Sequence, residues 1–178
     1  MRIFRPRKSS GTMTGLLVLL QSNALRQALQ EGSLSKDAYF AQLLRLVYRC
    51  IFTFSVEERG LIPTQPTAQD AQANPASARA KAAAAQAYAS GYALARLRDL
   101  ALRRRARTRF DDLWQAVKIV FHGLGQGQPR LGLPALGGVF AAHQCPHLDA
   151  AQLTNADLLA AMHALRWAPT PGGGPLAP

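Results

Sequence analysis

The chain has 178 residues, a length that suits one domain. Hydrophobic residues make up 48% of the sequence, enough for a buried core, and this excludes a wholly disordered chain. Lysine and arginine number 21 against 10 aspartate and glutamate, for a formal net charge of +11. That excess favours an anionic partner such as nucleic acid, an acidic subunit or a membrane surface.

Export and membrane insertion are not expected. No apolar run approaches the 18 residues that a membrane span requires. Basic residues at positions 2–8 precede an apolar run at 16–20, as in a signal peptide, but the run is too short and polar residues follow it at once. Cys50 and Cys145 lie far apart, and Cys50 sits within apolar residues, so no disulfide is expected. These features predict a cytoplasmic protein with no membrane partner.

The predicted organisation is a flexible basic lead at residues 1–13, a helical domain at 14–167 and a disordered, Pro- and Gly-rich tail at 168–178. The domain begins with an amphipathic helix that starts at Thr14 and stops at Gly32.

A second helix is predicted over residues 36–59. Ser35 is its N-cap, and Gly60 follows it where a left-handed C-terminal cap belongs. The side chains of this helix are apolar on almost every side, and Leu43 and Phe52 are expected in the core. The polar positions form one narrow stripe, which consists of Gln42, Arg45, Arg49, Thr53 and Glu57. The pattern predicts a central helix that neighbours cover on most sides.

Residues 63–77 lack periodicity and predict a mobile loop. The alanine-rich run at 82–87 favours helix and continues as an amphipathic helix to Ala101. Thr108 followed by Asp111 fits a capping box that starts another helix.

Residues 123–138 contain too many glycines and prolines for one regular element. Thr154 and Asp157 form a second capping box, and Leu153 and Leu158 fit a hydrophobic staple for a last helix that ends at Trp167. Since no segment indicates a strand, the predicted fold class is all-α: an irregular multi-helix domain around a central buried helix, with a flexible loop and disordered ends.

The sharpest polar feature is a cluster of five arginines within seven positions: Arg103, Arg104, Arg105, Arg107 and Arg109. Guanidinium groups this close repel one another unless an anion lies near, and arginine binds phosphate in a bidentate manner. These residues are therefore candidates for contact with the DNA backbone. A solvated helix end, whose positive charge suits the helix dipole, remains an equal alternative.

Other motifs do not favour a site. The glycines at 123–127 lack the preceding strand and the Lys-Ser or Lys-Thr of a phosphate loop. His143, Cys145 and His147 alternate, but no second ligand pair accompanies them, as a zinc site would require. Residues 57–59 (Glu-Glu-Arg) favour a solvated or salt-bridged surface over acid–base chemistry. No catalytic, metal-binding or cofactor-binding residue is predicted.

Several segments, in order, resemble the helical region that precedes the methyltransferase domain in type IIG-like restriction–modification DNA methylases. They are LLRLVYRCIFTFSVEERGLI at 43–62, GYALARLR at 91–98, FDDLW at 110–114, LPALGGVF at 133–140 and LTNADLL at 153–159. The first segment ends in Glu-Glu-Arg-Gly-Leu-Ile. It is similar to the Glu-Glu/Asp-Arg-Gly-Leu-Leu sequence at the end of the central helix in that region of the family. The resemblance extends over residues 16–167.

The resemblance implies adenine methylation of DNA with S-adenosylmethionine, with an attached nuclease in many members and a role in phage defence in some. This sequence lacks the Asn-Pro-Pro-Tyr catalytic motif, the Gly-rich cofactor loop after a strand and the Pro-Asp…Glu-x-Lys nuclease cluster. In the family the methyltransferase half begins near the position of Trp167, which leads to the expectation of a truncated or split gene product.

Two functions therefore remain from the sequence. The chain is expected to be a non-catalytic helical module of such a methyltransferase, a scaffold that binds DNA weakly and without sequence preference and that works with a missing or separately encoded methyltransferase part. The alternative is a stand-alone helical adaptor, without a role on DNA, whose apolar faces bind a partner protein.

Overall fold

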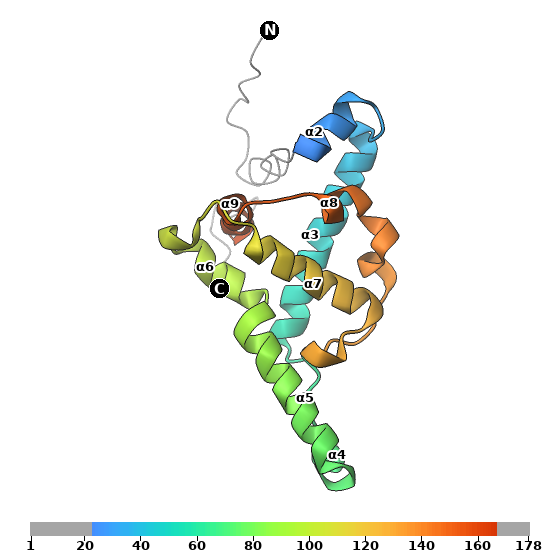
Figure 1. The fold of residues 1–178 in the computed structure, drawn as a ribbon, viewed down its shortest axis with the longest axis vertical. Helices are drawn as coiled ribbons and strands as arrows, with labels where there is room; N and C mark the ends of the chain where they lie inside the picture. Colours follow the sequence, from blue (N-terminus) through green and yellow to red (C-terminus); the bar gives the residue numbers. More distant parts are fainter. Residues whose placement is uncertain (1–22, 167–178) are drawn as a thin grey trace, which may run out of the picture.

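The computed structural model describes residues 23–166, and within them the fold is all-α (Figure 1). Its elements are α2 (Asn23–Gln30), α3 (Lys36–Glu58), α4 (Ala68–Ala73), α5 (Pro75–Ala87), a π-helical turn η2 (Tyr88–Tyr92), α6 (Ala95–Ala101), η3 (Arg104–Ala106), α7 (Asp112–Gln126), η4 (Pro129–Leu131), η5 (Gly138–Phe140), η6 (Ala142–Gln144), α8 (Pro146–Ala150) and α9 (Asn155–Arg166). The β contacts of this part amount to an isolated bridge between Gln128 and Leu133.

Parts of the expected organisation lie outside the described residues. They are the predicted lead at 1–13, the start of the first predicted helix at 14–22, Trp167 and the predicted tail at 168–178. Among the helices of the described part, none is both long enough and apolar enough to cross a membrane.

The ends of α3 follow the predicted capping signals. The Ser35 hydroxyl accepts a hydrogen bond from the Ala38 amide at 3.1 Å and so satisfies a free donor of the first turn. At the other end Gly60 has a φ of 65°, and the Leu61 amide donates to the Val56 carbonyl at 2.9 Å, as in a Schellman motif. Both predicted caps are confirmed. They could be predicted because each depends only on residues close in the sequence.

The orientation of α3 differs from the prediction. The side chains that it buries are Tyr39, Gln42, Leu43, Leu46, Arg49, Cys50 and Thr53. The outer face of α3 consists of five large apolar side chains that are between 42% and 55% exposed: Phe40, Leu44, Tyr48, Ile51 and Phe52. The expectation of a helix covered on most sides is therefore wrong, and so is the core position of Phe52, although Leu43 is buried. Three members of the expected polar stripe point inward.

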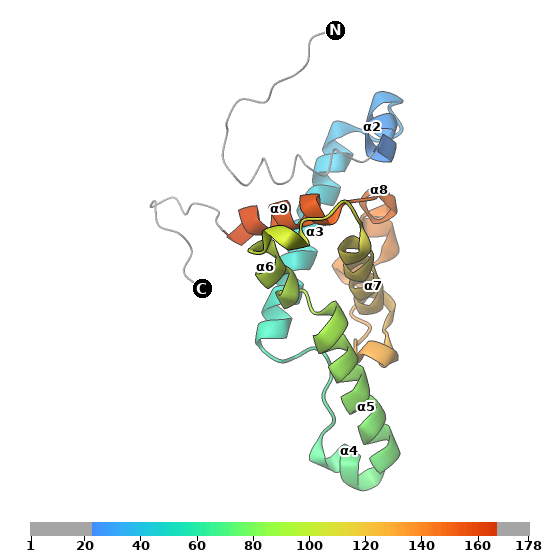
Figure 2. The ribbon, with the colours of Figure 1, turned by 60° about the vertical axis from the view of Figure 1, so that its left-hand side comes forward.

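Residues 63–77, predicted as a mobile loop, contain α4. A reciprocal capping box between Thr67 and Asp70 starts this helix, and the Asn74 side chain then caps α5. Lys81 on α5 binds Asp70 at 2.8 Å, and this contact is the largest cause that lowers the pKa of Asp70 to about 2. In Figures 1 and 2, α4 and the start of α5 form an arm that projects from the lower end of the molecule.

The predicted continuous helix from 82 to 101 is interrupted. After α5 the helix changes to the wider π-helical geometry of η2. Ala93 then has a ψ of 127°, which is outside the helical region. The Ala93 amide donates to the carbonyl of Tyr88 at 2.9 Å, which closes the π-helical turn. A new helix, α6, follows in a different direction (Figure 2).

The predicted capping box at Thr108 and Asp111 does not form. Helix α7 begins at Asp112 with no cap from its own N-cap side chain. Instead Asn155, from the start of α9, accepts from the Leu113 amide at 3.1 Å and donates to the Thr108 hydroxyl at 2.8 Å. The cap comes from a residue distant in the sequence, and it joins the beginnings of α7 and α9.

Helix α7 supplies the most completely buried face of the core. Trp114, Val117, Val120, Phe121 and Leu124 are all at most 2% exposed. The helix extends to Gln126, into the region predicted to be irregular. Its glycines permit close packing: a Cβ atom on Gly125 would lie 2.7 Å from the Phe140 carbonyl oxygen. Beyond Gln126 the segment consists of short turns, as predicted.

The start of α9 matches its predicted signals. The Thr154 hydroxyl accepts from the Asp157 amide at 3.2 Å and donates to the Asp157 carboxylate at 2.8 Å. Leu153 and Leu158 are both buried, as the predicted staple requires. This end of α9 therefore follows from local sequence alone.

Candidate functional site

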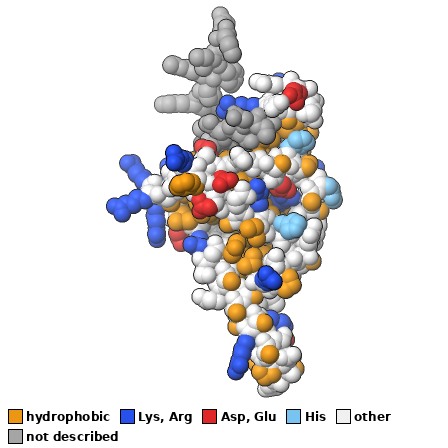
Figure 3. Space-filling view, in the orientation of Figure 1, with side chains coloured by type: hydrophobic (Ala, Val, Ile, Leu, Met, Phe, Trp, Pro, Cys, Tyr) orange, Lys and Arg blue, Asp and Glu red, His pale blue; other side chains and the backbone are white. Residues whose placement is uncertain are grey.

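The predicted DNA-contact residues lie together on an exposed loop. This arginine loop comprises residues 103–109, between α6 and α7, and contains the short turn η3. Its five arginines, Arg103, Arg104, Arg105, Arg107 and Arg109, are all exposed. In Figure 3 basic side chains project from the left edge of the molecule, where Figure 1 places the α6–α7 connection. The arginines therefore occupy a protruding loop, and not the helix end that was the alternative interpretation of this segment.

The backbone of the arginine loop is held by its own hydrogen bonds. The Arg103 amide donates to the Leu100 carbonyl at 2.9 Å, and the Ala106 amide donates to the Arg103 carbonyl at 3.0 Å. The Arg107 guanidinium donates to the Ala101 carbonyl at 3.1 Å, at the end of α6. These contacts hold the guanidinium groups on an ordered backbone, which reduces the conformational entropy cost of binding an anion.

The far end of the loop is anchored to α9. The Asn155 amide donates to the Phe110 carbonyl at 2.6 Å, and the Ala156 amide donates to the Thr108 carbonyl at 3.0 Å. Arg109 lies 5.8 Å from the centre of the Phe110 ring, which is 61% exposed. An exposed aromatic ring thus stands beside the positive charges.

Nearby carboxylates do not neutralise the arginines. Asp111 accepts from the Gln115 side chain at 2.8 Å, and Asp112 accepts from Asn155 at 2.8 Å. Within residues 23–166 no ion pair joins any arginine of the loop to an acid. The loop is consequently a concentrated positive surface that can bind an anion, above all the phosphates of a nucleic acid.

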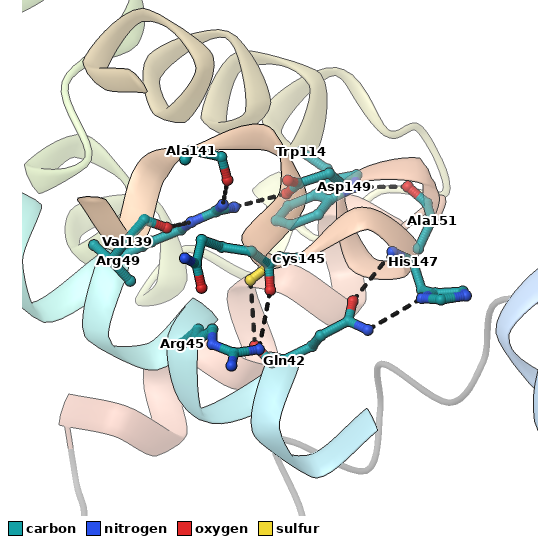
Figure 4. Close-up of polar contacts among 11 residues, drawn as sticks. Gln42, Arg45, Arg49, Trp114, Val139, Ala141, Cys145, His147, Asp149 and Ala151 are labelled. Carbon is teal, nitrogen blue, oxygen red and sulfur yellow. Dashed lines mark hydrogen bonds and ion pairs between the residues drawn. The ribbon is translucent and has the colours of Figure 1, made fainter. Parts of the chain in front are cut away.

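A second polar cluster lies inside the molecule, where α3 contacts the segment at 139–151 (Figure 4). Arg49 is 1% exposed, and its guanidinium donates to the carbonyls of Val139 at 2.8 Å and Ala141 at 3.2 Å and to the Asp149 carboxylate at 2.8 Å. The cation also lies 5.6 Å from the centre of the Phe121 ring. Arg49 thus holds α3, the turns η5 and η6 and helix α8 together, a role that the sequence prediction missed.

Gln42 adds a second link of the same kind. Its amide oxygen accepts from the His147 backbone amide at 3.1 Å, and its amide nitrogen lies 3.1 Å from the Nδ1 of the same histidine. Together Arg49 and Gln42 satisfy backbone groups of a segment without long helices. The inward polar residues of α3 therefore have a structural role.

The alternating residues His143, Cys145 and His147 do not converge. Cys145 is buried, and its thiol donates to the Gln42 carbonyl at 3.6 Å, while His143 contacts Gln144 and His147 contacts Gln42. Burial raises the pKa of the Cys145 thiol. Burial also raises the pKa of Cys50 to about 12, so both thiols are protonated at neutral pH.

A cavity of about 310 Å³ opens beside Arg49, between α7 and the segment at 140–149. Its polar lining includes Arg49, Lys118, His122 and Asp149, alongside the Phe121 ring. The carboxylate of Asp149 is already paired with Arg49, and among the described residues no acid pairs with His122. The cavity can hold a small polar molecule, but its residues do not form a coupled acid–base pair.

The two glutamates at the end of α3 have different environments. The Glu57 carboxylate accepts from the amides of Leu94 at 2.7 Å and Ala95 at 2.8 Å and from the Tyr88 hydroxyl at 2.5 Å. Burial, and then the neighbouring Glu57 carboxylate, raise the pKa of Tyr88. Glu58 instead forms an exposed ion pair with Arg98. Only Glu58 fits the salt-bridged surface expected here; Glu57 caps α6 and fixes the break between α5 and α6.

Tyr39, near the start of α3, has a buried hydroxyl group that lacks a hydrogen-bond partner among the described residues. Burial raises the pKa of this hydroxyl to about 12. Replacing Tyr39 by phenylalanine should therefore raise the free energy of unfolding, by about 1 kcal/mol, because a desolvated hydroxyl without a partner costs stability. Urea denaturation of the two proteins tests this, and a clear fall in stability in Tyr39→Phe would mean that the hydroxyl has a partner.

Across residues 23–166, no three or more His, Cys, Asp or Glu side chains gather in a way that could hold a metal ion. The Arg49 cluster is buried, whereas the arginine loop is exposed and open to a large ligand. Comparison of the chain with protein families, curated proteins and solved structures finds no match.

Proposed function

We propose that this chain is a non-catalytic helical module of a type IIG-like restriction–modification DNA methyltransferase, and that the arginine loop contacts the DNA backbone. The observation that carries the proposal is the loop itself, with five exposed guanidinium groups in seven positions and no carboxylate paired to them within the described residues. The segments that resemble the helical region of these methylases, and that follow one another in the same order along the chain, support it independently.

Under this proposal the chain acts as a scaffold, and catalysis belongs to a separate methyltransferase part. That part would bind S-adenosylmethionine and the flipped adenine, because flipping requires a pocket that stacks the base and reads its edge. The arginine loop would hold the duplex by its phosphates. Contacts to phosphates position a protein without reading sequence, so binding by this chain alone should be weak and indifferent to base order.

The proposal predicts a specific salt dependence of DNA binding. The association constant of the chain for a short duplex, measured by fluorescence anisotropy, should fall as salt rises, because bound phosphates release their counterions. Replacing Arg103, Arg104 and Arg105 by glutamine should reduce the logarithmic salt slope by up to about 0.9 for each phosphate that the variant no longer binds.

A matched variant separates the arginine loop from net charge. Replacing Arg79, Arg96 and Arg130, which are also exposed but lie on other elements, removes the same charge elsewhere on the molecule. The slope should change much less in this control. Equal slopes in the two variants, or no binding at low salt, would contradict a DNA contact at the loop.

A second function, a helical adaptor that binds a partner protein, is favoured by one observation. The outer face of α3 leaves five large apolar side chains exposed along one helix, and such surfaces in water mark protein interfaces. Binding through this face would depend little on salt, in contrast to binding through the arginine loop.

A further inference from the structure

The outer face of α3 is large for a solvated surface. Phe40, Tyr48 and Ile51 are each more than half exposed, and Leu44 and Phe52 are each more than two-fifths exposed. Side chains of this size together leave on the order of 400 Å² of apolar surface in water, which is within the range of the largest patch on a typical monomer.

This face has the shape that packs against another helix. Phe40, Leu44, Tyr48 and Ile51 follow one another at intervals of four, four and three residues, so they form a single ridge along α3. From Phe40 to Ile51 the ridge extends about 17 Å at the usual rise of an α-helix. The side chains of the ridge are all uncharged, and the half-buried Arg45 at its margin donates to the Gln144 carbonyl at 3.2 Å.

Each end of α3 carries one basic and one acidic residue, and their order along the chain is reversed between the two ends. The helix starts with Lys36 and Asp37, and it closes with Glu58 and its C-cap Arg59. At 100° per residue, measured from Leu44, Lys36 and Glu58 lie about 80° and 40° to one side, while Asp37 and Arg59 lie about 20° and 60° to the other.

This order makes the outer face complementary to itself. In an antiparallel pair related by a two-fold axis across the helices, each side of the face meets the same side of the partner, and the two helix ends are exchanged. Lys36 then faces Glu58 of the partner subunit, and Asp37 faces Arg59 of the partner subunit. The antiparallel arrangement also opposes the two helix dipoles, which a parallel pair would align.

We infer that the outer face of α3 binds the same face of a second copy of this chain in an antiparallel two-fold dimer. The apolar ridges bury each other, and the charged ends fix the direction and register. Within the described part Lys36, Asp37 and Arg59 form no ion pair, whereas Glu58 already pairs with Arg98 of its own subunit on the surface. The contact between Asp37 and Arg59 is therefore the one that forms without displacing an existing ion pair. The inference specifies the partner of the adaptor function and does not depend on DNA binding.

Light scattering of the full chain at increasing concentration, without DNA, should reveal a monomer–dimer equilibrium. Ile51→Glu should abolish the dimer, because it places a charge in the ridge, and it should leave the helical circular dichroism unchanged since Ile51 is exposed in the monomer. The arginine-loop variant should dimerise like the parent chain, so a failure of the DNA proposal would not affect this result. A chain that stays monomeric at all concentrations overturns the inference and leaves the face to a different protein.

Charge exchange tests the direction of packing. Asp37→Arg and Arg59→Asp should each weaken dimerisation about tenfold, because each creates two like-charge contacts in the symmetric pair. The double variant should restore dimerisation to within about threefold of the parent. Asp99→Arg, on the exposed surface of α6, is the control for the charge change and should have no effect. Failure of the double variant to restore the dimer would refute antiparallel packing, since in a parallel pair Asp37 would face Lys36 of the partner subunit.

Discussion

Replacing Arg49 by methionine is expected to lower the free energy of unfolding by about 3 kcal/mol. The substitution keeps most of the side-chain volume but removes three hydrogen bonds that join α3 to Val139, Ala141 and Asp149. The two carbonyls lose a charged donor, and Asp149 loses its counterion. Because Asp149 is 32% exposed, water compensates part of that last effect, and the expected change is below the cost of breaking a fully buried ion pair.

The matched control for this prediction is Arg45→Met, one turn earlier on the same helix. Arg45 is half-buried and makes one long hydrogen bond, to the Gln144 carbonyl, so the destabilisation should stay below about 1 kcal/mol. Urea denaturation monitored by circular dichroism gives both values. If Arg49→Met is as stable as Arg45→Met, then apolar packing alone holds the segment at 139–149 against α3.

The Arg49 cluster also explains why the orientation of α3 could not be predicted. The usual rule for an amphipathic helix places its polar stripe in water. In this helix apolar residues are abundant on every side, so periodicity could not decide which face is buried. The partners that draw Arg49 and Gln42 inward, Asp149 and His147, are 100 and 105 positions away in the sequence. No local pattern could have identified them.

The helix ends show the same difference between local contacts, which could be predicted, and distant ones, which could not. The caps at Ser35, Gly60 and Thr154 were predictable because each is made within a few residues of the helix that it ends. The expected cap at Thr108 failed because Asn155, 47 positions later, forms hydrogen bonds with Thr108 and with the first turn of α7. The signal in the sequence was present, but a tertiary contact supplied a better buried partner.

The exposure of the arginine loop, in contrast, followed from composition. Five arginines in seven positions cannot be buried together without acids to pair them, and the nearby sequence offers only Asp99, Asp111 and Asp112. The loop shape was not predictable, since it depends on contacts with α9. The role of these arginines on DNA stays a prediction.

The second large effect is expected at the end of α3. Glu57→Ala should lower the free energy of unfolding by about 3 kcal/mol, because one carboxylate satisfies three donors at the junction of α5 and α6. Tyr88 is 1% exposed, so its hydroxyl would be left buried without an acceptor. The amides of Leu94 and Ala95 would lose the negative group that caps the first turn of α6.

The neighbouring residue gives the control for this prediction. Glu58→Ala removes the same charge from the same turn, but it breaks only an exposed ion pair with Arg98, and such pairs contribute at most about 1 kcal/mol. Hydrogen exchange should also separate the two variants: amide protection in α6 should fall in Glu57→Ala and persist in Glu58→Ala. Because α6 leads directly into the arginine loop, Glu57→Ala should loosen that loop as well, although Glu57 lies on a different helix. Equal stability and equal protection in the two variants would mean that the α5–α6 junction holds itself without the carboxylate.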